Sequence, residues 1–420
     1  MDILHVVHGY FPALGGAETL IQGISEQLAS RHGDRVLVLT PNGYNTEAFV
    51  DPRQPLLPVG EREIDGVTVR RLPVTNRFAP ALFHLQRAAY HLRLPGNDRL
   101  RTWYGGPIVP GLARAIESFR GDLVAAASFP LLHMYTTLDA CRRSGKPLVF
   151  IGAIHPLDDW GYQRPMIYRA IRSADAYIAL SSYERDYLVE RCRVPEDKVT
   201  VVGVGIDPAP FELADGSEIR RRHEMGERPL VGFIGQQTAH KGIDALFLAM
   251  KLVWQERPET RLLVAGARTN VTPKLQAFFR ERLNPRERAR VTYLHNFSES
   301  EKPELFAACD IFAYPSWYES FGIAFLEAWS AGKPVVGARA GAVPAVVDED
   351  QDGLLVTPRD PISLATALLR LLESGELRRR LGEAGRKKVE TRYRWEVVSR
   401  KWREVYERVL SKGSGSCKSL

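Results

Sequence analysis

Two glutamates eight positions apart could bind one elongated ligand. Glu319 follows an apolar run that ends near Pro315, and Glu327 lies within the apolar run that comes next. The pattern predicts a strand that ends near Pro315 and a helix that begins near 321–322. Eight residues of helix rise about 12 Å, which is comparable to the distance from a sugar ring, across a diphosphate, to a ribose. The two carboxylates could therefore accept hydroxyl hydrogen bonds at opposite ends of one nucleotide-sugar.

The start of this predicted helix is a second ligand-binding feature. Its first N–H groups lack intrahelical partners and form the positive end of the helix dipole, which suits a phosphate or a sugar hydroxyl. Acids are favoured there even without a ligand, so Glu319 taken alone fits a helix-terminus residue. Glu327 is different, because an unpaired carboxylate inside an apolar helix would be costly.

A loop at residues 235–242 follows the predicted strand Leu230–Ile234 and opens a helix. Such a loop, at the carboxyl end of a parallel strand, is a typical anion site. Lys241 would supply a positive charge for a diphosphate. A lysine that is merely solvated is disfavoured at this position, because a helix N-terminus repels cations.

The spacing of Glu319 and Glu327 resembles the Glu-x7-Glu motif of the retaining glycosyltransferase family 4, which has the GT-B fold. The flanking segments also resemble the family: 306–316, 331–336 and 352–356. The resemblance implies that the first glutamate lies near the donor sugar and that the second binds the ribose hydroxyls. It further implies that three residues line the sugar and phosphate through their backbone: Ser320, Phe321 and Gly322.

Other segments extend the resemblance. Lys241 resembles the family's phosphate-binding lysine, but Gln236 stands where the family usually has an arginine. A neutral amide stabilises a leaving diphosphate less than a guanidinium does. Gly15 and Gly16 resemble the family's N-terminal Gly-Gly loop, which sits over the donor phosphates near the acceptor. His155, just past a predicted strand, resembles the histidine that contacts the donor sugar.

The resemblance thus divides the site residues into two groups. The expected catalytic residues are Glu319, His155 and Lys241. The expected donor-binding residues are Glu327, Gln236, Ser320, Phe321, Gly322, Gly15 and Gly16. We interpret 350–352, Asp-Gln-Asp, as a turn and not as a metal-binding motif. No metal is expected, and no cofactor other than the nucleotide-sugar co-substrate.

An α/β fold fits the pattern of the whole chain. Short β-branched runs alternate with longer amphipathic stretches, which is typical of parallel sheets flanked by helices. In the first half the expected strands are Ile3–Val7, Arg35–Leu39, Leu123–Ala126, Leu148–Ile151, Ala176–Leu180 and Val199–Val202. In the second half they are Leu230–Ile234, Arg261–Ala265, Arg290–Leu294, Asp310–Ala313, Pro334–Val336 and Gly353–Val356.

The alternation pauses between these two sets, which predicts two Rossmann-like domains facing across a cleft. The expected parts are an N-terminal acceptor-binding domain at 1–208, a linker at 209–228, a nucleotide-sugar-binding domain at 229–394, a helix at 395–412 and a flexible tail at 413–420. A return of the helix to the N-terminal domain is one option. Closure of the two domains on the donor would exclude water and limit hydrolysis.

Composition narrows the classes of partner only slightly. The 420 residues carry a net charge of +7, which suits an anionic partner without choosing among nucleic acid, membrane and phosphorylated substrate. The four cysteines show neither disulfide nor zinc spacing, so a reducing compartment is expected. The N-terminal residues lack a signal-peptide pattern, and no apolar run reaches about 20 residues. We therefore expect a cytoplasmic protein.

A basic amphipathic stretch bears on membrane contact. One helical face carries Leu82, Leu85, Ala89 and Leu92, and the other carries His84, Arg87 and His91. Such a helix can lie on an anionic membrane, at the cytoplasmic face, and would suit a lipid-linked acceptor. A helix packed on the first sheet is the commoner case, and we expect it here.

We expect this protein to transfer a sugar from a nucleotide-sugar to a glycan, lipid-linked or small-molecule acceptor, with retention of anomeric configuration. A nucleotide-sugar epimerase on the same fold is one alternative. A non-catalytic sugar-nucleotide-binding protein is another, and Gln236 keeps it open. A nucleic-acid partner is disfavoured, because the basic residues are spread along the chain without a recognised motif.

Overall fold

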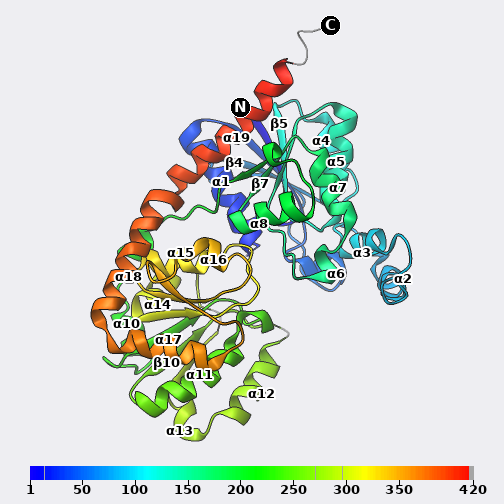
Figure 1. Ribbon diagram of the computed structural model, residues 1–420. Coiled ribbons are helices and arrows are strands. Elements are labelled where there is room, and N and C mark those ends of the chain that lie inside the picture. Colours follow the sequence, from blue (N-terminus) through cyan, green and yellow to red (C-terminus); the bar gives the residue numbers. More distant parts are fainter. Residues whose placement is uncertain (14, 270, 296, 416–420) are drawn as a thin grey trace. The chain divides into compact units, whose positions relative to one another are not determined.

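The computed structural model describes residues 1–13, 15–269, 271–295 and 297–415. The chain forms two compact units. Unit 1 comprises Met1–Gly205 and the C-terminal segment that starts at Trp395, and unit 2 comprises Ile206–Arg394. Each unit contains one largely parallel sheet with helices packed against it, so the expected α/β class with Rossmann-like domains is confirmed (Figure 1).

Unit 1 is built on an eight-stranded sheet with the order β3-β4-β2-β1-β5-β6-β7-β8. Neighbouring strands run parallel, except that β3 and β4 are antiparallel. The strands are β1 Asp2–Val6, β2 Arg35–Pro41, β3 Gly60–Ile64, β4 Val67–Leu72, β5 Leu123–Ala127, β6 Leu148–Ile151, β7 Ala176–Ala179 and β8 Val199–Val201. Their apolar residues form a buried core together with apolar residues of the helical segments 112–118, 132–144 and 165–173.

The sequence pattern missed β3 and β4, for a physical reason in each case. β3 is an edge strand whose charged residues face solvent, as edge strands that avoid aggregation often do. β4 alternates buried and half-buried residues, but an arginine occupies one of the buried positions. This residue, Arg71, donates a hydrogen bond to the carbonyl oxygen of Phe11 at 2.5 Å.

Helices connect the strands of unit 1. They are α1 Gly16–His32, α2 Ala79–His91, α3 Asn97–Gly105, α4 Leu112–Ser118, α5 Leu132–Ser144, α6 Asp159–Tyr162, α7 Pro165–Ser173, α8 Ser182–Asp186 and α19 Trp395–Gly415. The helix α2 packs chiefly against α3 and not on the sheet, which contradicts our expectation. Leu85 and Leu92, expected to face a core, are 56% and 68% exposed.

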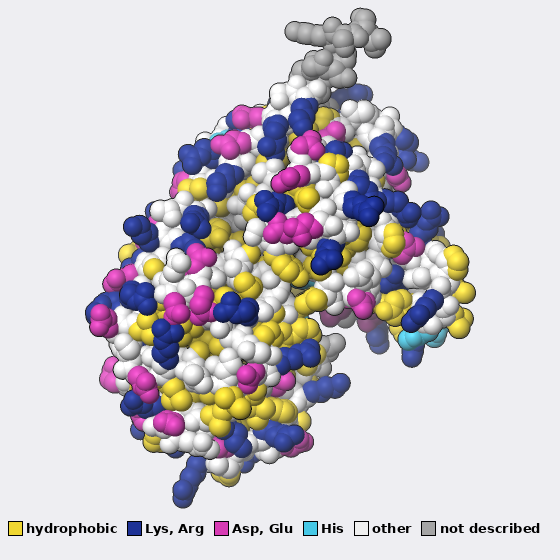
Figure 2. Space-filling model, viewed as in Figure 1, with side chains coloured by type: hydrophobic (Ala, Val, Ile, Leu, Met, Phe, Trp, Pro, Cys, Tyr) yellow, Lys and Arg dark blue, Asp and Glu magenta, His cyan; other side chains and the backbone are white. Residues whose placement is uncertain are grey.

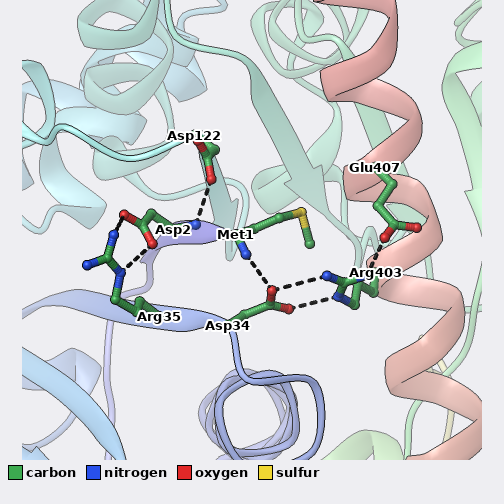
Figure 3. Close-up of polar contacts among 7 residues, drawn as sticks. All are labelled: Met1, Asp2, Asp34, Arg35, Asp122, Arg403 and Glu407. Atoms are coloured by element: carbon green, nitrogen blue, oxygen red, sulfur yellow. Dashed lines mark hydrogen bonds and ion pairs between the residues drawn. The ribbon is translucent and has the colours of Figure 1, made fainter.

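The C-terminal helix α19 returns to unit 1 and lies beside α1 (Figure 1). The Nε2 atom of His5 in β1 lies 3.1 Å from the hydroxyl of Tyr406 in α19. Figure 3 shows a second attachment, in which the buried carboxylate of Asp34 binds the Met1 amino group at 2.6 Å and Nε of Arg403 at 3.0 Å. The helix includes residues 413–415 of the expected tail, and 416–420 lie outside the described residues.

Unit 2 is built on a six-stranded parallel sheet with the order β11-β10-β9-β12-β13-β14. The strands are β9 Leu230–Ile234, β10 Arg261–Ala265, β11 Val291–Leu294, β12 Ile311–Tyr314, β13 Val335–Ala338 and β14 Gly353–Val356. The helices are α9 Ala209–Glu212, α10 Ser217–Arg222, α11 Ile243–Glu256, α12 Thr272–Arg282, α13 Pro285–Arg288, α14 Lys302–Ala308, α15 Ile323–Ser330, α16 Val343–Val346, α17 Pro361–Glu373 and α18 Gly375–Lys388.

Residues 209–228 are part of unit 2, whereas the sequence predicted a linker there. The helix α10 packs against α14, and its Ile219 is fully buried. Arg220 donates to the carbonyl oxygen of Ala308 and pairs with Asp310, both at 2.9 Å. The proline-rich and charged composition suggested a linker because these anchoring contacts are long-range and leave no local signal.

Across the described residues, we find no helix that combines the length and apolar character needed to span a membrane.

Candidate functional site

Two loops of unit 2 meet at the carboxyl edge of its sheet. The loop 235–242 follows β9, and the loop 315–322 follows β12, which pairs directly with β9. The carbonyl oxygen of His240 accepts hydrogen bonds from the backbone N–H of Trp317 and the hydroxyl of Ser316, both at 3.1 Å. The sheet order therefore joins two segments that the sequence singled out separately.

Lys241 and Glu319 form an ion pair at this edge. The Nζ atom of Lys241 lies 2.5 Å from Oε1 of Glu319, and the two side chains are only 14% and 10% exposed. The ammonium also lies 5.1 Å from the centre of the Tyr314 ring. Burial alone would lower the pKa of Lys241, but Tyr314 and Glu319 outweigh it and raise that pKa. The structure thus holds a fully charged cation where we expected a diphosphate contact.

Tyr314, the last residue of β12, was missed by the sequence analysis. Its ring is buried beneath Lys241, and burial raises the pKa of its phenol to about 12. It is therefore neutral and acts on Lys241 as an aromatic face. An aromatic residue at the end of a buried strand is common in cores, so the sequence carried no functional signal.

The backbone of Glu319 is fixed by a third loop. The N–H of Ala342 donates to the carbonyl oxygen of Glu319 at 3.1 Å. Gly341 has a φ of 55°, and a Cβ atom there would lie 2.8 Å from the same oxygen. The loop leads directly into α16, whose first turn contains Pro344. The loop at 341–342 is therefore a direct neighbour of Glu319, a predicted catalytic residue. The sequence analysis did not identify this contact.

The helix α15 begins at Ile323, slightly later than predicted. Gly322 precedes it with a φ of 98°, a conformation that strongly favours glycine. The side chain of Phe321 is buried, with its ring 5.6 Å from that of Tyr393, while Ser320 is partly exposed. The buried side chain of Phe321 is thus inaccessible to a ligand, and a ligand contact through its backbone stays a prediction.

Glu327 is buried on α15, but it has a partner that the sequence analysis missed. The Nζ atom of Lys302 lies 2.6 Å from Oε1 of Glu327 and 3.4 Å from the exposed Glu299. Burial raises the pKa of Glu327, because Lys302 offsets only part of the desolvation. Burial also lowers the pKa of Lys302, but Glu327 and Glu299 together raise it by more.

The signal for Lys302 was present in the sequence. It is the first residue of α14, where the helix dipole disfavours a cation. The same argument marked Lys241 as a functional residue. The argument that a helix N-terminus disfavours a cation therefore points to both lysines that contact the predicted site glutamates.

Gln236, the departure from the expected arginine, is exposed at the start of the loop 235–242. The next residue, Gln237, is fully buried instead. Its Nε2 atom lies 3.3 Å from the carbonyl oxygen of Gly266 and 3.0 Å from Nδ1 of His295. Gln237 therefore helps to hold the loop, whereas Gln236 faces solvent, where a ligand can reach it.

In unit 1 the two predicted glycines lie at the start of α1, Gly15 as its N-cap and Gly16 as its first residue, and they differ in their surroundings. A Cβ atom on Gly15 would lie 2.4 Å from Oε2 of Glu18, whereas one on Gly16 would meet nothing within 4 Å. Glu18 also pairs with Nε2 of His8 at 3.0 Å, and Nδ1 of His8 lies 2.7 Å from the hydroxyl of Ser128. Burial opposes ionisation of Glu18, but His8 outweighs it and lowers the pKa of this carboxyl. His8 and Ser128 were not predicted.

His155 lies beyond the end of β6, partly exposed, with its ring 5.5 Å from that of Tyr162. Its carbonyl oxygen accepts a hydrogen bond from the N–H of Asp158 at 3.1 Å. The carboxylate of Asp158 caps α6 by accepting from the N–H of Gly161 at 2.8 Å. His155 and the glycines belong to unit 1, and the glutamates and lysines described above belong to unit 2.

The Asp-Gln-Asp segment forms a turn, in which Asp350 has a φ of 59°. Asp350 pairs with Arg370 at 2.6 Å, and the buried Asp352 pairs with Lys388. Both carboxylates are thus engaged within the protein. Among the described residues, no group of three or more histidine, cysteine or acidic side chains has a metal-binding arrangement.

Comparisons with known proteins match both units. Residues 14–210 match the profile of Glycosyltransferase Family 4, and residues 215–388 match that of Glycosyl transferases group 1. An uncharacterized glycosyltransferase of Methanocaldococcus jannaschii is 28% identical over 97% of this chain and 98% of its own length. D-inositol 3-phosphate glycosyltransferase of Corynebacterium glutamicum is 29% identical over 57% of this chain, and the aligned part spans 59% of that relative.

Solved structures agree on the fold. The Anabaena protein HepE in complex with UDP-glucose superposes with a TM-score of 0.71 and 18% identity, covering 97% of this chain and 100% of its own. At this identity the likeness supports the two-domain architecture and nothing finer. Taken with the two profile matches, it shows that the chain belongs to the group-1 glycosyltransferases of family 4, which have the GT-B fold.

Proposed function

We propose that this protein is a glycosyltransferase that moves a hexosyl group from a nucleotide-sugar to an acceptor. The observation that carries the proposal is the arrangement at the carboxyl edge of unit 2. There the ammonium of Lys241 pairs with the carboxylate of Glu319, in the loop before α15. A second carboxylate, that of Glu327, is buried on α15 itself. An elongated ligand with an anionic centre and hydroxyls at both ends matches this set of groups.

In the proposed mechanism the donor binds to unit 2. Glu327 holds the ribose, and Lys241, with the N–H groups at the start of α15, holds the diphosphate. The uncharged amide of Gln236 donates a hydrogen bond to the diphosphate leaving group. Stabilisation of the departing nucleoside diphosphate would supply most of the rate enhancement. Lys241 must release part of its hold on Glu319 for this purpose, which frees the carboxylate for a sugar hydroxyl.

The sugar and acceptor would depend on unit 1 as well. His155 orients the donor sugar, and the Gly15–Gly16 loop covers the phosphates near the acceptor. The acceptor is a glycan, a lipid-linked sugar or a small hydroxylated molecule, and transfer proceeds with retention of configuration and without a metal. Two similar proteins support a hexosyl donor. HepE of Anabaena was solved with UDP-glucose, and MMP alpha-(1->4)-mannosyltransferase of Mycolicibacterium hassiacum is 29% identical over 75% of this chain and 79% of its own length.

A panel of nucleotide-sugars tests this proposal. Purified protein is incubated with UDP-, GDP- and ADP-hexoses, with and without a chelator, and both thermal shift and slow sugar release are measured. Glu327→Gln removes the charge but keeps the contact to Lys302, and Glu299→Gln is its control, because Glu299 contacts the same lysine from the surface. We expect the wild type and Glu299→Gln to bind and hydrolyse one donor. Glu327→Gln should lose both the binding and the hydrolysis of that donor. Binding without any release, in the presence of acceptor extracts, would favour the non-catalytic alternative.

We also propose that this enzyme acts in the cytoplasm and touches an anionic membrane through α2. The positions 78, 81, 85, 88 and 92 recur with helical spacing, and all are apolar and exposed. His84, Arg87 and His91 form the adjacent face and are exposed as well. A helix with neighbouring apolar and basic faces suits the boundary between lipid headgroups and acyl chains.

The residues around α2 also suit contact with an anionic membrane. Figure 2 shows hydrophobic, basic and histidine side chains gathered over α2 and α3. The exposed side chains there include Phe78, Phe83, Leu85, Leu92, Leu94 and Trp103. No acidic residue occurs between 66 and 97, whereas five arginines do. An anionic surface is therefore the partner that this charge favours.

Vesicle sedimentation tests the membrane contact. The protein is mixed with vesicles of phosphatidylcholine alone or of equal parts phosphatidylcholine and phosphatidylglycerol. We expect sedimentation with the anionic vesicles only, reduced by salt and abolished in Leu85→Ser/Leu92→Ser. Leu213→Ser serves as the control, because Leu213 is 86% exposed in unit 2. Equal sedimentation of the α2 variant and the control would contradict the proposal.

A further inference from the structure

The carboxylate of Glu184 is buried in unit 1 although it was not predicted to have any role. Its side chain is 1% exposed and comes from α8, which follows β7. Burying a carboxylate is costly unless its oxygens accept several hydrogen bonds. The partners of this group therefore indicate what it stabilises.

Four donors surround Glu184. Its Oε1 atom accepts from the hydroxyl of Tyr177 at 2.6 Å and from the N–H groups of Ala153 at 2.9 Å and Ile154 at 2.8 Å. Its Oε2 atom accepts from the N–H of Leu180 at 2.8 Å. All of these partners donate, which favours the ionised form of the carboxyl and opposes the burial that raises its pKa. The carboxylate thereby ties the carboxyl end of β6 to that of β7.

The turn at the end of β6 is built around this carboxylate. Ala153 has a φ of 115°, which side-chain-bearing residues rarely adopt. A Cβ atom on Gly152 would lie 2.5 Å from Oε2 of Glu184. Two N–H groups of the turn thus point at Oε1, and the absence of a side chain at Gly152 lets the carboxylate approach the backbone. His155 directly follows Ile154, the last residue of this turn.

We propose that Glu184 is a positioning residue for His155: it fixes the turn 152–154 and so sets where the imidazole projects from the edge of the sheet. Glu184 touches neither donor nor acceptor in this proposal. Its effect on transfer rests on the proposed function of His155. The position of the imidazole does not depend on that function and can be measured separately.

Imidazole NMR signals of ¹⁵N-histidine-labelled full-length protein test the positioning directly. His155→Gln identifies the His155 signal. We expect Glu184→Gln to shift or broaden this signal and to leave that of His240, in unit 2, unchanged. Glu190→Gln is the matched control, because Glu190 is exposed a few residues further on. A folded Glu184→Gln protein with an unmoved His155 signal would overturn the proposal. If that variant fails to fold, Tyr177→Phe removes one donor from the same oxygen and is read in the same way.

A double-mutant cycle then tests the consequence for the reaction. A small misplacement of a catalytic group costs about tenfold or more in kcat, so we expect this loss in Glu184→Gln. In a His155→Ala background the same substitution should have no further effect on kcat. Additive losses would show that Glu184 does not act through His155. Absence of sugar release by the wild-type protein would refute the transferase proposal, while the NMR result would still decide the role of Glu184.

Discussion

The ammonium of Lys302 lies 2.6 Å from Oε1 of Glu327, so the carboxylate on α15 has a partly buried counter-ion supplied by the first residue of α14. This pair explains how a helix with an otherwise apolar face tolerates an ionised glutamate. The pair also sets the protonation state in which Glu327 meets a ligand.

Lys302→Met should destabilise unit 2, because it leaves a buried carboxylate without its cation. The loss is roughly 3 kcal/mol in unfolding free energy. The pKa of Glu327, already raised by burial, should rise further and weaken nucleotide binding. Urea unfolding and nucleotide titration measure the two effects. Lys302→Met/Glu327→Gln should recover most of the stability but not the binding, and no recovery would argue against the pair.

Lys241→Met should lower kcat/KM for the donor by about a hundredfold, since removal of one preorganised group that stabilises developing charge has an effect of this size. Its Tm should change less than its activity. Lys274→Met is the control, because Lys274 is exposed in the same unit. Initial rates of sugar release over a range of donor concentrations check the prediction. Similar kinetics in both variants would remove Lys241 from the mechanism.

Gly16→Ala should leave the fold intact, because the added Cβ atom meets nothing within 4 Å. If the donor phosphates approach this backbone, the same methyl group should still weaken nucleotide affinity. Gly15→Ala should lower the Tm, because its Cβ atom would press on the carboxylate of Glu18. Calorimetric titration and thermal denaturation separate the two effects. Wild-type nucleotide affinity in Gly16→Ala would place the phosphates elsewhere.

Gln236→Arg should increase the rate of sugar release several-fold, because a guanidinium stabilises a leaving diphosphate better than an amide does. The side chain is exposed, so the substitution should not change the Tm. Single-turnover kinetics with the preferred donor measure the effect. A rate that falls in this variant would mean that Gln236 has a specific role of its own.

Stability should decrease in mild acid because of buried histidines in unit 1. Burial lowers the pKa of His5 and of His133 from 6.5 to about 3, with a further contribution from His8 to the latter. Since the folded state resists protonation, this stability is fully present above about pH 6.5 and is lost as the pH falls toward 3. At about pH 5 each histidine reduces the unfolding free energy by about 2 kcal/mol.

Urea unfolding near neutral pH and near pH 5 checks this expectation. His5→Gln should lose less stability on acidification than the wild type does, even though it is less stable at neutral pH. His84→Gln is the control, because His84 is exposed on α2. An identical acid loss in the wild type and His5→Gln would assign the effect to other groups.

The sequence by itself determined the α/β class and most of the central strands. Several predicted strands have the observed bounds, among them Leu148–Ile151, Leu230–Ile234 and Gly353–Val356. These are buried parallel strands, which are continuous apolar runs whatever their neighbours are. The family resemblance also came from one local segment around Glu319 and Glu327, where the motif residues are close in sequence.

Tertiary structure decided which charged groups meet. Lys241 is far from Glu319 in the chain, and they touch because β9 and β12 are adjacent in the sheet. Glu184 reaches the turn at 152–154 for the same reason, through β6 and β7. Strand order places such pairs, and it depends on the packing of the whole unit. Local patterns do not record it, and for that reason they also missed the partner of Glu327 and the inclusion of 209–228 in unit 2.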